Sequence, residues 1–540
     1  MRFWFCFGAA VAMAHSAEPV LTHLHPAGIQ QGTSTTVKLA GKFEPWPCKV
    51  WTDTPGIVFT PAKDVGTFDV VVSADVKTGP HLLRAFNDQG ASAPISMVID
   101  SPLQTMEKEP NDDFRAPQVL AGTAATCNGR LDKSGDVDSF SVALKKGQTM
   151  IAWIEAYTLA AGFDAMLRIV DSKGLTLAFN HDHTTMDPFL AFCAPEDGPY
   201  MIQTMGQKYP ASSEISFAGG DDCVYRLHVS TEAFVRNTWP LAVPRLTKTS
   251  VTLEGWNLNA TQAQIDSASP PVFPVTFSHV PEFIEIAEPQ LLAIPSGLSG
   301  RIGTPGEEDR FSFTATKDTK LVFSVKGPTI GSMMDPWLKI LNKDGKQLAI
   351  DDDAAGRSEP RIVWAAPADA TYTVVLGEVT SRGGADFFYH LVIVNASPSV
   401  SASILTHGVK LEAGKSAEVK ITVAIANGYQ SKLKLAAKNL PPGITAQEVD
   451  VPEKGGEAAI TLAAETNASR ASQPWQLVLR EAEGGTEHPV IFSMASTTED
   501  NGVPQGYHKL LINTTDQIWL TVTVTPPPAA PAPAAIPSGN

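Results

Sequence analysis

Hydrophobic and polar residues alternate in short runs along almost the whole chain. Runs such as TSTTVKLAG from Thr33, RFSFTAT from Arg310 and AEVKITVAI from Ala417 carry an apolar residue at nearly every second position. This period of two is typical of strands that bury one face, and Gly, Pro, Asn and Asp bound the runs. Signals for helices are almost absent. The pattern therefore predicts an all-β fold built of tandem β-sandwiches.

A long segment of the sequence occurs twice. GRLDKSGDVDSFSVALKKGQ from Gly129 aligns with GRIGTPGEEDRFSFTATKDT from Gly300, at an offset of 171 residues. The same offset holds for residues 163–182 and 334–353. Because chance does not align several strand-turn units in this way, we infer two copies of one domain.

A fainter repeat lies ahead of each copy. The run HPAGIQQGTSTTVKLAGKF from His25 is similar to WPLAVPRLTKTSVTLEGWNL from Trp239. We interpret both as Ig-like units. The second is truncated, because only about fifty residues separate Phe234 from Glu285.

These patterns predict seven parts of the chain. They are a signal peptide at 1–17, an Ig-like domain at 18–100, a first copy at 104–231, a truncated Ig-like segment or linker at 232–283, a second copy at 284–397, a C-terminal Ig-like sandwich at 398–525 and a Pro/Ala-rich disordered tail at 526–540. We call residues 104–231 the first repeat and residues 284–397 the second repeat.

The N-terminal stretch has the composition of an export signal. Arg2 precedes an apolar run from Phe3 to Ala14 that is too short to span a bilayer, and Ala14 and Ser16 form a small-residue cleavage pattern. No later stretch approaches the ~20 apolar residues of a membrane span. We expect an exported protein without a membrane span, located in the periplasm, at the cell surface or outside the cell.

The net charge narrows the classes of partner. The 540 residues include 41 Lys and Arg against 57 Asp and Glu, a formal net charge of -16. A protein that binds nucleic acid without sequence preference needs a basic face, so we expect no nucleic-acid partner. The negative net charge is compatible with cations and neutral polymers as binding partners.

Four cysteines follow the signal, namely Cys48, Cys127, Cys193 and Cys223. A bridge between Cys127 and Cys223 and a set of free buried thiols are both compatible with the sequence, since four cysteines allow three full pairings. The absence of a C-x-x-C motif gives structural zinc little support.

The repeated domain resembles a known family. E-P-N-D at 109–112, G-D-x-D-x-F at 135–140, D-x-x-L-x-I-x-D-x-x-G at 164–174 and A-P-x-x-G-x-Y at 194–200 follow one another in the first repeat. This order is similar to that of bacterial pre-peptidase C-terminal (PPC) domains, which are jelly-roll sandwiches of secreted proteases and other exported proteins. The run from Pro26 to Gly41 resembles Ig-like domains of the TIG/IPT type. The combination is similar to exported proteins of planctomycete-like bacteria.

The resemblance implies a calcium site. The related collagen-binding modules of clostridial collagenases bind Ca²⁺ through an E-x-E-x-N-D linker and an acidic hairpin. Oxygen ligands of this kind, six or more in number, suit Ca²⁺. The alternative is a solvated acidic linker. Carried onto this sequence, the implied ligands are Glu107, Glu109, Asn111, Asp112, Asp136 and Asp138.

The second repeat lacks part of this ligand set. Its linker EIAEPQ keeps Glu288 and Pro289 but has no Asn-Asp pair, and GDVD becomes GEED with Glu307 and Asp309. We therefore expect the first repeat to bind Ca²⁺ and the second to bind little.

No catalytic motif is present, since the sequence has no H-E-x-x-H, G-x-S-x-G, P-loop or G-x-G-x-x-G. We expect a non-enzymatic exported protein that binds a polysaccharide, a fibrous protein or a cell-surface protein. The alternative is an accessory or targeting subunit of a secreted protease or other hydrolase, which rests on analogy of fold. The candidate contact residues are Trp46, Trp239, Trp256 and Trp337.

Overall fold

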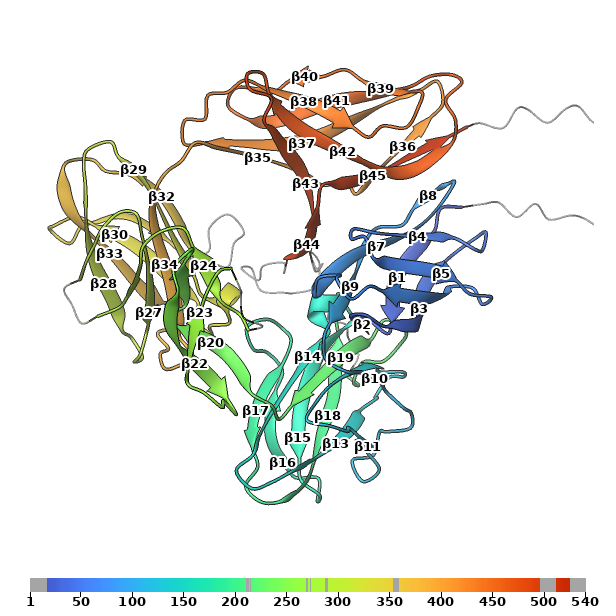
Figure 1. Ribbon diagram of the computed structural model, residues 1–540, viewed down its shortest axis with the longest axis vertical. Helices are drawn as coiled ribbons and strands as arrows, with labels where there is room; N and C mark the ends of the chain where they lie inside the picture. Colours follow the sequence, from blue (N-terminus) through green and yellow to red (C-terminus); the bar gives the residue numbers. More distant parts are fainter. Residues whose placement is uncertain are drawn as a thin grey trace, which may run out of the picture.

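The computed structural model describes residues 17–209, 213, 215–268, 271, 273–286, 290–352, 359–495 and 511–524. Within these residues the chain forms β-strands and two short 3₁₀ turns, with no α-helix, so the prediction of an all-β fold is confirmed (Figure 1). No helix of this part of the chain is long and apolar enough to cross a membrane. The predicted signal peptide, apart from Ala17, and the predicted tail lie outside the described residues.

The N-terminal part is a sandwich of two sheets, which we call the first sandwich. Alternate residues of its strands, such as Val37, Leu39, Phe68 and Val70, are buried between the sheets. The sheet orders are β1-β3-β6-β5 and β2-β9-β7-β4, with β8 paired to β7. The strands are β1 (Val20–His25), β2 (Gly28–Gln30), β3 (Ser34–Lys42), β4 (Lys49–Thr52), β5 (Ile57–Pro61), β6 (Thr67–Val72), β7 (Gly79–Asn87), β8 (Gly90–Ala91) and β9 (Ile95–Asp100).

The first repeat is a sandwich of two five-stranded sheets. Their orders are β10-β12-β19-β14-β17 and β11-β13-β18-β15-β16. The strands are β10 (Gln104–Met106), β11 (Gln118–Val119), β12 (Ala124–Arg130), β13 (Asp138–Leu144), β14 (Thr149–Glu155), β15 (Phe163–Val170), β16 (Thr176–Asn180), β17 (Phe189–Cys193), β18 (Gly198–Lys208) and β19 (Val224–Ser230), with the 3₁₀ turn η1 at Tyr157–Leu159.

The second repeat has the same sheets, strand for strand. Their orders are β25-β27-β34-β29-β32 and β26-β28-β33-β30-β31, so each strand corresponds to the one fifteen places earlier. The strands are β25 (Glu282–Ile284), β26 (Gln290–Leu292), β27 (Ser296–Arg301), β28 (Glu308–Ala315), β29 (Lys320–Lys326), β30 (Pro336–Leu341), β31 (Gln347–Asp351), β32 (Arg361–Ala365), β33 (Ala370–Glu378) and β34 (Phe388–Asn395), with η2 at Pro328–Ile330. The internal repeat inferred from the sequence is thus present in the fold.

A smaller unit lies between the repeats and a larger sandwich follows them. The small unit has a three-stranded sheet, β20-β22-β23, and the pair β21-β24. Its strands are β20 (Phe234–Trp239), β21 (Ala242–Pro244), β22 (Thr249–Trp256), β23 (Gln262–Ile265) and β24 (Thr276–Ser278). The last sandwich has β35 (Ser399–Ile404), β36 (Gly408–Glu412), β37 (Ser416–Ala426), β38 (Leu433–Lys438), β39 (Ile444–Ala446), β40 (Val449–Asp450), β41 (Gly456–Ala464), β42 (Ala471–Glu481), β43 (Glu487–Ala495), β44 (Leu511–Thr515) and β45 (Gln517–Thr523).

The sandwiches follow a closed course. Figure 1 shows the first sandwich, the two repeats and the last sandwich arranged around the molecule, so that β8 lies beside β45. The two ends of the described chain therefore meet although they are far apart in the sequence.

The sequence left a disulfide bridge and free thiols as alternatives for the cysteines. In the structure Cys48, Cys127, Cys193 and Cys223 are free thiols. Cys127 and Cys223 are both buried in the core of the first repeat but form no bridge. Burial raises the pKa of both thiols, that of Cys223 to about 12, so both stay protonated and unreactive.

Candidate metal centre

The six side chains implied as calcium ligands lie together in the first repeat. Four of them follow β10, and the other two lie on the turn before β13 and at its first residue. Oxygen atoms of Glu107, Glu109 and Asp138 lie within 4.8 Å of one another, and so do those of Glu109, Asp112 and Asp136. We call the whole set the linker cluster: Glu107, Glu109, Asn111, Asp112, Asp136 and Asp138.

Three oxygen atoms of the linker cluster are buried without a hydrogen-bond partner. They are Asn111 Oδ1, Asp136 Oδ1 and Asp138 Oδ1. These residues are 1%, 1% and 0% exposed. Buried polar atoms in proteins nearly always have a partner, so an unpartnered group calls for an explanation. A cation can satisfy several such acceptors at once.

Hydrogen bonds fix the directions of the other atoms. The backbone N–H of Arg130 donates to Glu107 Oε2 at 2.8 Å, and Asn111 Nδ2 donates to Glu107 Oε1 at 3.0 Å. The backbone N–H of Asp132 donates to Asp136 Oδ2 at 2.6 Å. Since the amide nitrogen of Asn111 is used in this way, its Oδ1 is the atom left for another partner.

A buried tyrosine contacts the inner side of the cluster. The hydroxyl of Tyr225 lies 2.9 Å from Glu107 Oε1 and 2.7 Å from Asp138 Oδ2. A phenol carries one proton, so it donates to only one carboxylate at a time. Burial, and then the charge of Glu107, raise the pKa of Asp138 well above its usual range. A cation here would offset that repulsion.

A lysine contacts the outer side of the cluster. Lys133 Nζ lies 2.8 Å from Asp112 Oδ2 and 3.7 Å from Asp136 Oδ1. The lysine side chain is exposed, so it can turn away into solvent. A divalent cation bound at the cluster would compete with this ammonium group. Sequence reasoning missed both Lys133 and Tyr225, although a tyrosine recurs in the last strand of each repeat.

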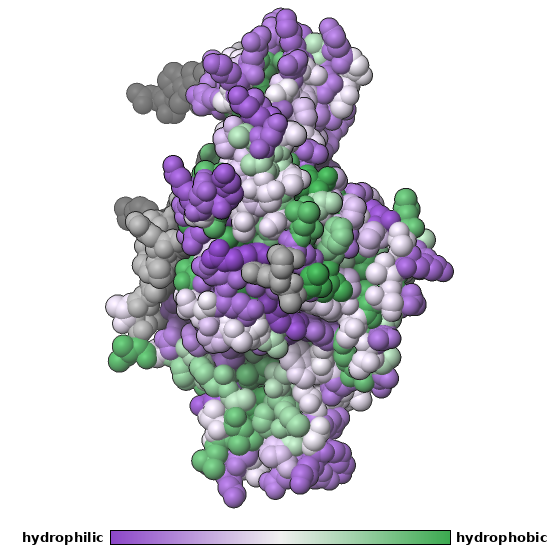
Figure 2. Space-filling view, turned by 90° about the vertical axis from the view of Figure 1, so that its left-hand side faces the viewer, coloured by the Kyte–Doolittle hydropathy of each residue, from purple (hydrophilic) through white to green (hydrophobic). Residues whose placement is uncertain are grey.

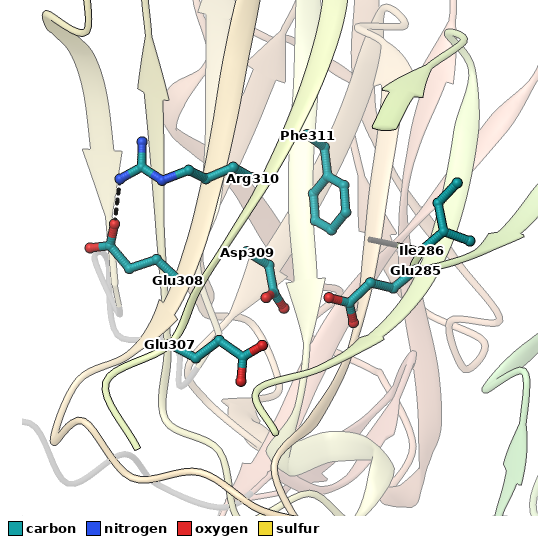
Figure 3. Close-up of a pocket in the computed structure, with 7 residues that line it drawn as sticks. All are labelled: Glu285, Ile286, Glu307, Glu308, Asp309, Arg310 and Phe311. Carbon is teal, nitrogen blue, oxygen red and sulfur yellow. Dashed lines mark hydrogen bonds and ion pairs between the residues drawn. The ribbon is translucent and has the colours of Figure 1, made fainter. Parts of the chain in front are cut away.

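In the second repeat the equivalent place is an open acidic hollow (Figure 3). The N–H of Arg301 donates to Glu285 Oε2 at 2.9 Å, and the hydroxyl of Tyr389 donates to Asp309 Oδ2 at 2.7 Å. Oxygen atoms of Glu285, Glu307 and Asp309 lie within 4.8 Å of one another. They line a hollow of about 460 Å³.

The two repeats differ here in the length of one segment. Gln118 Oε1 accepts the N–H of Lys108 at 2.7 Å, and Gln290 Oε1 accepts that of Ile286 at 3.1 Å, so the glutamines occupy equivalent positions. Residues 109–117 separate the first pair and residues 287–289 the second. The segment that carries Glu109, Asn111 and Asp112 is therefore six residues shorter in the second repeat.

The structure adds one pair of equivalent residues to the alignment of the linkers. Glu285 takes the place of Glu107 in the second repeat, because it accepts the equivalent backbone N–H. Glu288 and Pro289, which the sequence alignment retained, lie outside the described residues.

The candidate tryptophans are packed against other side chains. A ligand platform of the kind that stacks on sugars needs an open ring face. Trp46 contacts the rings of Phe43 and Phe68, Trp239 lies 4.9 Å from the Arg301 guanidinium, Trp256 contacts Phe189 and Phe234, and Trp337 lies 3.7 Å from Lys339 Nζ.

An edge strand of the first repeat exposes apolar side chains. β16 ends its sheet, and Leu175, Leu177 and Phe179, at or beside it, are 62%, 41% and 49% exposed. Leu177 and Phe179 lie two residues apart in this strand, beside a shift in its register with β15, and both are exposed. Figure 2 shows hydrophobic residues gathered at the lower end of the molecule, which the first repeat forms.

No known protein family matches the sequence, and no curated protein matches it. Similar solved structures include the pre-peptidase C-terminal domain of a collagenase from Bacillus anthracis, with 13% identity over 20% of this chain and 97% of that chain and a TM-score of 0.17. Fibronectin(III)-like modules of Clostridium thermocellum CbhA are 12% identical over 44% of this chain and 94% of that chain, with a TM-score of 0.14. At these scores the likenesses carry no argument about function.

Proposed function

We propose that this chain is an exported, non-catalytic binding protein whose first repeat binds Ca²⁺ at the linker cluster. The observation that supports calcium is the set of three buried oxygens of Asn111, Asp136 and Asp138 that have no hydrogen-bond partner. Glu107 and Glu109 add carboxylate oxygens beside them. Hard, oxygen-only ligand sets of mixed charge suit Ca²⁺ better than transition metals.

The ion would act next to the joint between the first sandwich and the first repeat. Arg226 of the repeat is fully buried and forms ion pairs with Asp100 and Glu155. The N–H of Gly28 donates to Asn128 Oδ1 at 3.0 Å across the same joint. An ion that orders residues 107–112 would therefore stiffen the path of the chain into the first repeat.

We propose a polypeptide partner, either a fibrous or a cell-surface protein, rather than a polysaccharide. The edge strand β16 offers unpaired backbone groups beside Leu177 and Phe179, and an extended segment of another chain can pair with such an edge. All four candidate tryptophans are half-buried and contact neighbouring side chains, which leaves less ring surface for stacking on a sugar.

Calorimetry and thermal melts of the full mature chain test the calcium. Ca²⁺ is expected to bind with measurable heat and to raise the melting temperature, and a chelator to reverse both. Asp138→Asn should abolish the effect, and Asp309→Asn at the equivalent position of the second repeat should leave it unchanged. If a chelator does not change the melting temperature, the calcium site is contradicted and the linker cluster is a solvated acidic linker.

Retention on an immobilised fibrous protein and on an insoluble polysaccharide tests the partner. The double variant Leu177→Lys with Phe179→Lys is expected to lose retention on the protein. Ile350→Lys, at the exposed position of β31 that corresponds to Phe179, is the matched control and should keep it. Retention on the polysaccharide alone contradicts the proposed partner, and hydrolysis of either material contradicts a non-catalytic protein.

A further inference from the structure

The first and last sandwiches meet through an aromatic contact. Trp519 of β45 packs against Phe86, with ring centres 4.9 Å apart, and against Trp51 at 6.1 Å. Asn513 Nδ2 donates to the carbonyl oxygen of Pro80 at 3.0 Å. We call this set of interactions the closing contact, because it joins the two ends of the course that Figure 1 shows.

A guanidinium group without a counter-ion lies inside the closing contact. Arg84 is 0% exposed, and its Nη1 donates to the carbonyl oxygen of Ser92 at 3.2 Å and lies 3.0 Å from His407 Nδ1. Its Nε and Nη2 have no hydrogen-bond partner. Burial lowers the pKa of Arg84 to about 10. Its carbon Cζ lies 6.0 Å from the centre of the Trp51 ring, and within the described residues no carboxylate forms an ion pair with it.

The other joint of the first sandwich shows the usual arrangement. Arg226 is also 0% exposed, but it is paired with Asp100 and Glu155. A buried charge is costly unless it is paired, so the pairing stabilises that joint and its absence weakens the closing contact. The two ends of the first sandwich are therefore held with unequal strength.

His407 can add a second positive charge to the closing contact. Burial, and then the charge of Arg84, lower the pKa of His407 below 6.5. Glu18, which pairs with Lys410 at 2.6 Å, acts in the opposite direction. An imidazole exposed by opening has an ordinary pKa of about 6.5, so the closed form binds fewer protons than the open form. Closure is thus favoured above about pH 6.5 and disfavoured as the pH falls below it.

We propose that the closing contact is a reversible latch, closed at neutral pH and opened by acidification, whose stability Arg84 and His407 control. Opening separates Trp519 from Trp51 and Phe86 and leaves the joint at Arg226 intact. The protein then changes from a closed to an extended course without unfolding any sandwich.

Small-angle scattering of the full mature chain, in saturating Ca²⁺, tests the latch. Between about pH 7.5 and about pH 5.5, the radius of gyration is expected to rise by roughly 10% or more while the circular dichroism stays constant. Arg84→Met keeps the length of the side chain and removes its charge, so this variant should open less than the unmodified chain at about pH 5.5. His407→Gln, which does not titrate, should stay compact at both values and serves if Arg84→Met fails to fold.

Arg480→Met is the control for loss of one positive charge. Arg480 is exposed in the last sandwich and pairs with Glu448, so this variant should open like the unmodified chain. A radius that does not change with pH in the unmodified chain overturns the proposal. Opening of Arg84→Met and His407→Gln to the same extent also overturns it, because the titrating groups then lie elsewhere.

Discussion

At the scale of single residues, the linker cluster depends on where each oxygen points. Asn111 is informative because it is its neutral member and almost fully buried. Its Nδ2 bond to Glu107 holds the carboxamide so that Oδ1 is left without a partner. The residue thus links the direction of one carboxylate to the availability of another ligand atom.

Replacement of this amide tests that link. Asn111→Ala removes one ligand and the bond that orients Glu107. We expect Ca²⁺ affinity to fall about tenfold or more, which corresponds to ~1.4 kcal/mol. Calorimetry on the full chain measures the change, and an unaltered dissociation constant contradicts a ligand role for Asn111.

Lys133 provides a prediction of the opposite sign. Its ammonium group neutralises Asp112 and Asp136, which a divalent cation also needs. Lys133→Gln should therefore raise Ca²⁺ affinity by a few-fold, because the ion then no longer competes with this exposed ammonium group. Lys145→Gln is the matched control, because Lys145 forms an exposed pair with Asp197 at 3.0 Å away from the cluster. Equal effects of the two variants would show a general effect of charge only.

At the scale of elements, one segment length separates a closed cluster from an open hollow. Residues 109–117 bring Glu109, Asn111 and Asp112 to the turn before β13, whereas only three residues of sequence separate the equivalent positions Ile286 and Gln290. The strands around both sites have the same order. The difference between the repeats therefore lies in this segment rather than in the sandwich.

A graft of this segment is expected to create a second site. Replacing residues 287–289 with the sequence of 109–117 supplies the missing oxygens to Glu285, Glu307 and Asp309, which already lie within 4.8 Å of one another. Equilibrium dialysis should show one more Ca²⁺ bound per chain. The same graft with alanine in place of its Asn, Asp and Glu residues is the control, and an unchanged ion count for the intact graft refutes the importance of the segment.

At the scale of the whole molecule, the order of the sandwiches depends on charges buried at their joints. Burial alone would raise the pKa of Glu155, but His228 and Arg226 outweigh it and lower the pKa to about 2. The carboxylate therefore stabilises the folded joint above about pH 4.5, and this contribution is lost as the pH falls toward 2.

The joint can be tested with Glu155→Gln. At neutral pH this change should lower the free energy of unfolding by about 2 kcal/mol, because Arg226 keeps Asp100 as a partner. Urea unfolding at several pH values measures the difference in the free energy of unfolding between the variant and the unmodified chain. This difference should become smaller below about pH 4.5. Glu457→Gln, at an exposed ion pair with Lys420, should have almost the same free energy of unfolding as the unmodified chain at every pH. If the difference for Glu155→Gln is as large in acid as at neutral pH, the assigned pairing is contradicted.

The fold class and most of the candidate site can be predicted from the amino-acid sequence. Period-two alternation is a local consequence of one buried strand face, and the doubled motif order fixed the repeat before any contact was known. The six cluster residues could be predicted together because four lie within residues 107–112 and the other two flank the start of β13.

Which buried charges have a partner depends on contacts between residues that are far apart in the sequence. Tyr225 contacts Asp138 of the linker cluster, although the two residues are 87 positions apart in the sequence. His407 contacts Arg84, which is 323 positions away in the sequence. Arg84 and Arg226 both stand in strands with apolar neighbours, yet only Arg226 is given carboxylate partners. Whether a charge is buried and paired depends on which surfaces of the sandwiches contact each other. The alternation of residues along a strand does not predict those contacts.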